Sequence, residues 1–154
     1  MMPRISDIEL IKTPEQPVIS IRARTPADKL PMVIGQAFGK LAAYLVSLGE
    51  HPSGIPFVAY HNMDMADLDV EMGFPVAAPL PGHEDIQYSP VPAGKRVFCM
   101  YLGAYSEMAP VYDEMASWIT ANGYTPVGTA YEYYYNGPDC PTAQLLTQIA
   151  MPVK

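Results

Sequence analysis

The chain has 154 residues, of which 49% are hydrophobic and 16% charged, a composition typical of a globular protein rather than a disordered one. Its formal net charge is −7, from 16 acidic and 9 basic residues, and no basic run occurs along it. We therefore expect no direct binding to nucleic acid, since no cluster of cations is present to meet a phosphate backbone. The length favours a single domain over residues 1–154.

The N-terminus lacks the apolar core of a secretory signal, and no apolar run approaches the roughly 20 residues of a membrane span. The two cysteines, Cys99 and Cys140, are typical of free thiols in a reducing compartment. We therefore expect a cytoplasmic protein that does not bind a membrane. The sequence leaves its oligomeric state open.

The first half of the chain predicts four strands and one long helix. Alternating side chains place the strands at residues 5–12, 17–24, 56–61 and 67–74, with a Thr-Pro-Glu-Gln-Pro turn between the first two. The helix covers 30–48, because its apolar residues recur at helical spacing, Pro31 suits its first turn and Gly49 can end it. In the last strand we expect Asp69 and Glu71 to point toward solvent.

The second half of the chain predicts a similar order of elements. Strands are expected at 84–91, 95–103, 129–135 and in a last segment that ends at Val153. A helix covers about 107–121, with Ser106 as its N-cap and Asn122-Gly123 as its end.

The two halves also share a residue spacing, which indicates an internal repeat. Gly49–Asn62 and Gly123–Asn136 both read Gly-x-x-Pro-x-Gly-x-x-x-x-x-Tyr-x-Asn without a gap. The repeats cover about 5–76 and 84–153, and each predicts a β-α-β-β module. We therefore expect an α+β fold with pseudo-two-fold symmetry, an antiparallel sheet and two long helices.

The stretch that follows Ala130 predicts an aromatic strand that ends in an Asn-Gly-Pro turn. Since side chains alternate along a strand, Glu132 and Tyr134 share one face, and the neighbouring tyrosines share the other. In the repeat register Val58 takes the place of Glu132, so the scaffold itself does not require this acid. If buried, the carboxylate suits a flat lipophilic cation; the alternative is a carboxylate that points to water.

Four segments carry a resemblance to a known family: Gly103-Ala104-Tyr105, the helix with Trp118 and Gly123, Glu132 to Pro138, and Leu146 to Val153. Together they resemble the GyrI-like small-molecule-binding domains, which are also the effector-binding domains of AraC-type and MerR-type multidrug-responsive transcription regulators. The resemblance implies two pseudo-symmetric modules with a ligand cleft between them, in which Glu132 meets a lipophilic cation beside Tyr134. Two positions depart from the pattern: Tyr101 stands where many members have His, and Gln148 where they have an acid.

We predict a ligand site that contains Glu132, Tyr134, Trp118, Tyr101 and Tyr60. Tyr60 enters through its pseudo-symmetry with Tyr134, and Tyr101 through its place in the family pattern. Trp118 lies near the end of the helix, where a Trp is more often a core residue than a ligand platform. No spacing of His and Cys assembles a metal site, and no nucleophile or phosphate-loop motif occurs. We therefore expect no metal and no cofactor.

Three functions fit these residues. The first is a stand-alone module that senses or sequesters a lipophilic, cationic aromatic compound. We expect no helix-turn-helix in this chain, so a regulatory role would require a separate regulator. The second, which the resemblance implies for some members, is a hydrolase of reactive cyclopropane-type compounds with Glu132 as general base. The third is a gyrase-inhibitor-like protein-interaction module, which only the acidic hairpin at 64–71 favours.

Overall fold

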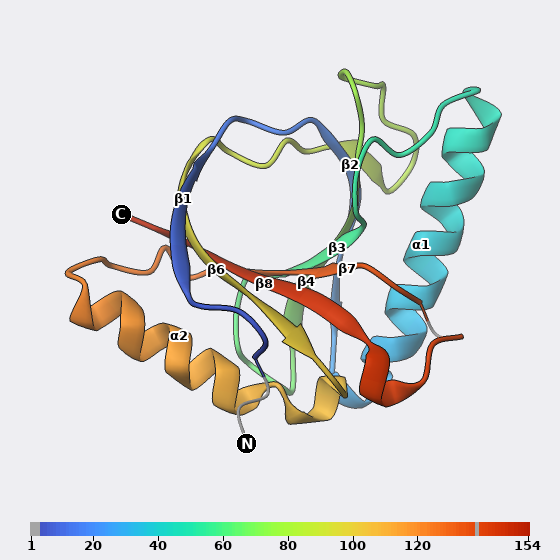
Figure 1. The fold of residues 1–154 in the computed structure, drawn as a ribbon. Helices are drawn as coiled ribbons and strands as arrows, with labels where there is room; N and C mark the ends of the chain where they lie inside the picture. Colours follow the sequence, from blue (N-terminus) through green and yellow to red (C-terminus); the bar gives the residue numbers. More distant parts are fainter. Residues whose placement is uncertain (1–3, 138) are drawn as a thin grey trace. The chain divides into compact units, whose positions relative to one another are not determined.

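The computed structural model describes residues 4–137 and 139–154 (Figure 1). The first three residues and Pro138, the last residue of the predicted turn, lie outside the described residues. The chain divides into an N-terminal unit, residues 14–93, and a C-terminal unit, residues 94–154 together with the segment up to Thr13. Within the described residues each unit contains four antiparallel strands and one long helix, which confirms the α+β class.

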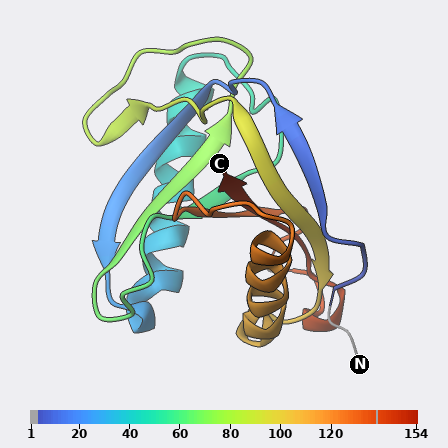
Figure 2. The same ribbon diagram turned by 90° about the vertical axis from the view of Figure 1, so that its left-hand side faces the viewer.

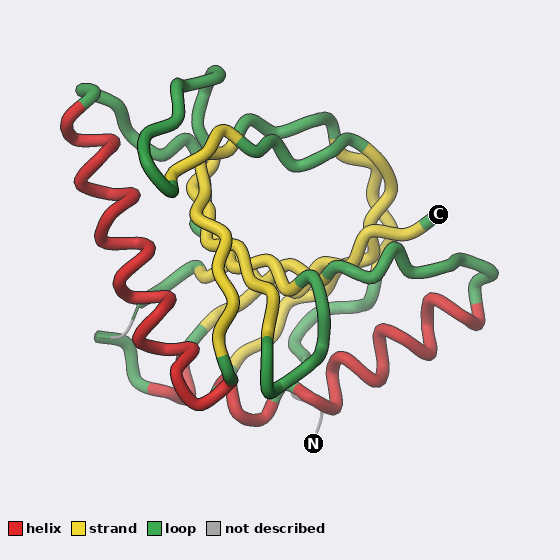
Figure 3. Tube along the Cα trace, turned by 180° about the vertical axis from the view of Figure 1, so that it is seen from behind, coloured by secondary structure: helices red, strands yellow, loops and turns green. Residues whose placement is uncertain are grey.

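The N-terminal unit has the strand order β5-β2-β4-β3. Its elements are β2 (Val18–Thr25), the 3₁₀ turn η1 (Ala27–Lys29), α1 (Leu30–Ser47), β3 (Phe57–Tyr60), β4 (Leu68–Pro75) and β5 (Ile86–Tyr88). The helix packs on β2 and β4, and its buried residues Ala37, Leu41 and Leu45 recur at the predicted helical spacing. Figure 3 shows the same elements from behind, with helices in red and strands in yellow.

The C-terminal unit has the strand order β1-β6-β8-β7. Its elements are β1 (Glu9–Thr13), β6 (Gly94–Leu102), the 3₁₀ turn η2 (Tyr105–Glu107), α2 (Ala109–Ala121), β7 (Ala130–Tyr134), the 3₁₀ turn η3 (Thr142–Gln144) and β8 (Leu146–Val153). Figure 2 shows α2 in orange with β6 in yellow and β1 in blue. The core of the unit joins Val111, Met115 and Ile119 of α2 to Val97 of β6 and Ile149 of β8.

Both units contain the predicted order of strand, helix, strand and strand, and each has one added strand at an edge. The added strand of the N-terminal unit is β5, which is shorter than the predicted strand at 84–91. The added strand of the C-terminal unit is β1, which pairs with β6 and not with β2, its neighbour in the chain. Both edges of β2 are already occupied, by β4 and β5. The N-terminal strand therefore belongs with the second predicted repeat, and the duplication itself stays a prediction.

The two helices end as the sequence predicts. Gly49 and Gly123 follow α1 and α2 in the left-handed region, with φ of +69° and +80°. In both cases the next N–H group donates back to a helix carbonyl, from Glu50 to Leu45 (2.9 Å) and from Tyr124 to Ile119 (3.0 Å). This is the Schellman arrangement, in which a glycine satisfies carbonyls at the end of a helix.

The predicted start of the second helix is wrong. Ser106 lies inside η2 rather than at an N-cap, and α2 begins at Ala109 with no side chain capping it. Pro110 occupies the first turn of α2, where its missing N–H group leaves no helical bond unmade. The prediction began the helix too early because apolar spacing does not distinguish the 3₁₀ turn η2 from the first turn of an α-helix.

The predicted exposure of Glu71 is also wrong, because its carboxylate is buried. Ser20 donates to one oxygen at 2.6 Å, and His61 Nε2 lies 2.9 Å from the other. Burial raises the pKa of Glu71, but hydrogen bonds from His61, Ser20 and Ser89 outweigh it, so the pKa lies below its ordinary value. At Glu71, the face of β4 that points away from α1 is therefore buried rather than exposed to solvent.

One segment corrects the prediction that no apolar run is long enough to span a membrane. Ala27–Ser47 is the one helical segment among the described residues that passes this test by length and composition. In the structure one face of α1 packs on β2 and β4. Packing within the N-terminal unit therefore accounts for the apolar residues on that face of the helix.

The two cysteines are free thiols, as predicted. Cys99 lies in the core of the C-terminal unit, and burial raises the pKa of its thiol to about 11. Cys140 is half-buried in the loop after β7. Because the thiolate is the reactive form, Cys99 has the properties of a packing residue rather than a nucleophile.

Gly73→Ala tests the packing between β3 and β4. A Cβ atom at Gly73 would lie 2.6 Å from Phe57 Cζ and 2.9 Å from Val18 Cγ1, so these side chains must shift. We expect a loss of about 2 kcal/mol in the free energy of unfolding, measured by urea denaturation. The matched control is Gly35→Ala on α1, where a Cβ meets nothing within 4 Å; this change should stabilise by about 0.5–1 kcal/mol. Equal effects of the two changes would contradict the packing described.

Candidate ligand-binding site

Glu132 lies in the middle of β7, on the face of the strand that α2 covers. It stands opposite Ile149 of β8, a core residue that packs against α2, and it is 8% exposed. Tyr134 shares its face, while Tyr131 and Tyr133 project from the other. The structure therefore has the predicted alternation, with the acid buried rather than pointing to water.

Two tyrosine hydroxyl groups bind the Glu132 carboxylate. Tyr134 donates to Oε1 at 2.8 Å, and Tyr112, from α2, donates to Oε2. No Lys, Arg or His in the described part of the chain forms an ion pair with Glu132. The carboxylate thus has hydrogen-bond donors but no counter-ion.

The surroundings of Glu132 shift its protonation. Burial raises the pKa of Glu132 above its ordinary value, and the hydrogen bonds from Tyr112 and Tyr134 lower it by less. Tyr105 packs its ring against that of Tyr134, with centroids 5.4 Å apart and planes at 64°. Burial and the charge of Glu132 raise the pKa of Tyr105. Three tyrosines therefore lie around one acid.

Thr147 adds an unsatisfied polar atom to the same face. It lies on β8 opposite Tyr134 on one side and Tyr101 on the other, and it is fully buried. Its Oγ1 is the one buried side-chain nitrogen or oxygen in the described residues without a hydrogen-bond partner. Such a group normally finds a partner, which a bound molecule or a water can supply.

The five predicted site residues have different surroundings. Glu132 and Tyr134 are hydrogen-bonded to each other, whereas the buried Tyr101 donates its hydroxyl to the carbonyl of Ala104. Trp118 packs on the core of the C-terminal unit and stacks on Tyr124, with ring centroids 6.4 Å apart. Tyr60 ends β3 of the N-terminal unit. The structure thus brings two of the five together, and the ligand roles of all five stay predictions.

Sequence reasoning missed Tyr112, which lies on α2 in the apolar stripe that contains Val111, Met115 and Ile119. That stripe faces the sheet, and a tyrosine hydroxyl buried there needs a partner. Glu132, on the strand face that packs against the helix, is the acid in reach. Conversely, Gln148, where the family pattern has an acid, pairs in register with Tyr133 and lies on the face opposite to Glu132.

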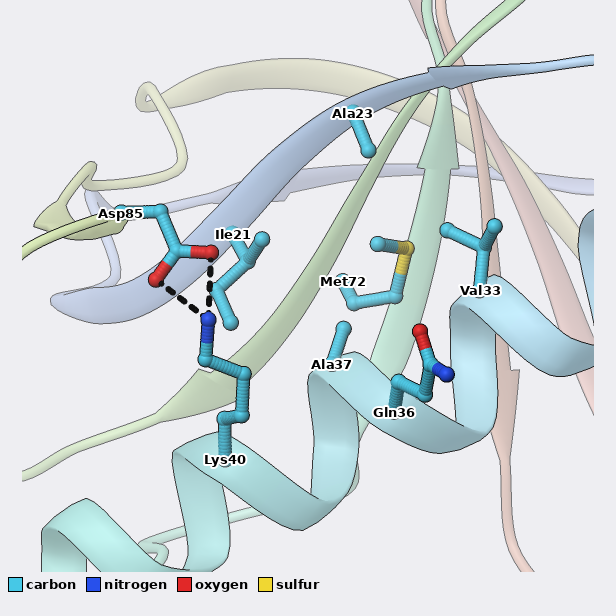
Figure 4. Close-up of a pocket in the computed structure, with 8 residues that line it drawn as sticks. All are labelled: Ile21, Ala23, Val33, Gln36, Ala37, Lys40, Met72 and Asp85. Carbon is cyan, nitrogen blue, oxygen red and sulfur yellow. Dashed lines mark hydrogen bonds and ion pairs between the residues drawn. The ribbon is translucent and has the colours of Figure 1, made fainter.

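The N-terminal unit contains a separate cavity of about 170 Å³ between α1 and strands β2 and β4 (Figure 4). Its lining residues are Ile21, Ala23, Val33, Gln36, Ala37, Lys40, Met72 and Asp85. Most of the lining is apolar, and an ion pair between Lys40 and Asp85, 2.8 Å long, lies at one end. None of the predicted site residues lines this cavity.

The chain is similar in structure to EcmrR. In a complex of EcmrR with DNA the TM-score is 0.83 at 22% identity, and the match covers 96% of this chain and 57% of that one. This chain therefore spans little more than half of the EcmrR chain. For the EcmrR C-terminal domain alone the TM-score is 0.75 at 24% identity, with 97% of this chain and 98% of that chain covered.

Two further structures share the fold at lower identity. A hydrolase from Listeria innocua has a TM-score of 0.69 at 15% identity, with coverage of 96% of this chain and 91% of that one. SAV2435 bound to tetraphenylphosphonium has a TM-score of 0.63 at 12% identity, with coverage of 97% and 94%. No curated protein sequence matches the chain. The family of GyrI-like small molecule binding domains matches residues 6–154, nearly the whole chain, and the chain belongs to this family.

Proposed function

We propose that the chain senses or sequesters a lipophilic, cationic aromatic compound, with Glu132 as the anchor for its charge. The observation that supports this most directly is a carboxylate 8% exposed, with no cation paired to it among the described residues. A buried charge without a counter-ion is costly, and a bound cation offsets that cost. We place the protein in the cytoplasm.

The tyrosines support an aromatic or lipophilic cation over a small hydrated one. Tyr112 and Tyr134 touch the acid through their hydroxyl groups, and Tyr105 packs on Tyr134. Aromatic faces attract a desolvated cation by up to about 2 kcal/mol. SAV2435, which has the same fold, was solved with tetraphenylphosphonium, a cation of this kind. This ion is therefore a suitable first probe.

Hydrolysis of reactive cyclopropane-type compounds is the second candidate, and the raised pKa of Glu132 favours it. A carboxylate whose pKa lies closer to neutrality is a better general base toward water. In this reaction Glu132 takes a proton from the water that attacks a ring carbon, the carbon–carbon bond of the ring at that atom breaks, and its electron pair takes up a proton. Multiple turnovers of such a compound by the wild type and none by Glu132→Gln would support it; capture without product would exclude it.

The acidic hairpin that favours the protein-interaction alternative is partly neutralised. In the acidic hairpin, Asp69 is bound by Arg22 through two hydrogen bonds of 2.8 and 2.7 Å, and Asp67 pairs with Arg24 at 3.3 Å. These acids are neutralised within their own unit rather than held open for a basic partner. Asp64 and Glu71 form no ion pair with a Lys or Arg among the described residues, so the charge of the hairpin is offset in part.

Glu132→Gln tests the anchor role by calorimetric titration with tetraphenylphosphonium. The change keeps the shape of the side chain but removes its charge, so we expect affinity to fall at least about tenfold. The matched control, Glu107→Gln, removes an exposed acid from η2 of the same unit, and affinity should stay within about twofold. If Glu132→Gln binds as tightly as the wild type, Glu132 is not the anchor.

The pH dependence of the free energy of unfolding tests whether the pKa of Glu132 is raised in the protein without a ligand. Because its folded pKa is raised, the folded chain binds this proton more tightly than the unfolded chain does. The resulting stabilisation is present below the ordinary pKa of Glu and is lost as pH rises through the raised pKa. In urea titrations the free energy of unfolding of the wild type relative to Glu132→Gln should therefore fall as the pH rises from about 4 through the raised pKa of the folded state. A difference independent of pH would contradict the raised pKa.

A further inference from the structure

A buried arginine lies on the other face of the strands that carry Glu132. Arg96, on β6, has its guanidinium carbon 5.0 Å from the ring centroid of Tyr131 and 5.9 Å from that of Tyr133. Its Nη1 donates to the Tyr133 hydroxyl at 3.0 Å, and the two rings stack with centroids 6.2 Å apart. Since Glu132 sits between these tyrosines in the chain and points toward α2, the two charged groups lie on opposite faces.

Arg96 differs from the other arginines of the chain. Arg4, Arg22 and Arg24 form ion pairs with carboxylates at 2.8, 2.7 and 3.3 Å. Arg96 is 8% exposed, and no carboxylate in the described residues pairs with it. Buried charges in proteins are normally paired, because leaving one unpaired costs several kcal/mol. The most enclosed cation thus has only tyrosines for partners.

The guanidinium nitrogens of Arg96 that form no hydrogen bond keep some exposure to solvent, although the residue as a whole is only 8% exposed. Thr147 Oγ1 is the one fully buried side-chain nitrogen or oxygen without a hydrogen-bond partner in the part of the chain that the structure describes. The nitrogens of Arg96 that lack a partner are therefore not sealed in the interior. A small molecule can reach them while the tyrosine rings cover the body of the side chain.

We propose that Arg96 is a binding site for a small carboxylate anion, independent of the Glu132 site. The guanidinium presents its N–H donors in a planar fork, which matches the two oxygens of a carboxylate. Cation–π contacts with Tyr131 and Tyr133 hold the fork in place, so little side-chain entropy is lost on binding. The net charge of −7 repels anions in general, so any saturable binding must come from the local arrangement.

Benzoate and benzamide test this proposal on the wild-type protein, because they share a ring and differ in charge. The probe is the Arg96 Nε–H resonance in ¹H–¹⁵N spectra recorded during each titration. We expect benzoate to move this resonance saturably, with a dissociation constant on the order of 1 mM. Benzamide should leave it in place. An unmoved resonance with benzoate, or the same movement with benzamide, would overturn the site.

Variants check that the response comes from the guanidinium. Arg96→Gln should abolish the saturable rise in melting temperature with benzoate, and Tyr133→Phe, which keeps the cation but loses the 3.0 Å hydrogen bond, should weaken it several-fold. Lys95→Gln removes the neighbouring exposed cation, on the opposite face of β6, and should respond as the wild type does. Equal responses of Arg96→Gln and wild type would reject the proposal. If Arg96→Gln does not fold, the wild-type titration decides alone.

Discussion

The hydrogen bonds that Tyr112 and Tyr134 donate to Glu132 are the constraint on which the candidate site depends. One comes from α2 and the other from β7, so the acid links the helix to the strand it covers. The two hydroxyl groups satisfy the carboxylate oxygens without neutralising the charge, while burial raises the pKa. The result is a buried acid that is held in place and still lacks a counter-ion among the described residues. In the predicted repeat register the apolar Val58 of β3 takes the place of Glu132, so a framework role would not require an acid there.

The alternation of side chains along β7 separates two charges of opposite sign. Glu132 points toward α2, whereas Tyr131 and Tyr133 point the other way and hold Arg96. The causes that shift the pKa of Glu132 are burial and two tyrosines, and Arg96 is not among them. The backbone of the sheet therefore keeps the charges apart, which leaves each of them for its proposed ligand of opposite sign. One short aromatic strand supplies tyrosines to both sites.

Local rules predicted much of this structure from the sequence. The period of two in β7 predicted which side chains accompany Glu132, and the glycines at 49 and 123 predicted both helix ends. The errors arose where tertiary contacts decide. The pairing of β1 with β6 and the burial of Glu71 beside Ser20 join segments distant in the chain. The hydrogen bond from Tyr112 likewise requires knowing which strand faces the helix. Periodicity predicts on which face of a strand or helix a side chain lies, but not which residue it contacts.

The pKa of Glu132 is the most direct test of its proposed role as the anchor for a cation. The ¹³C shift of its carboxyl carbon, followed against pH with and without tetraphenylphosphonium, reports the pKa of this one group. In the free protein we predict a pKa above that of an ordinary glutamate. When the cation is bound we predict a clear fall of this pKa, because a nearby positive charge favours the carboxylate. An ordinary pKa that the cation leaves unchanged would contradict the claim that Glu132 is a buried acid awaiting a counter-ion.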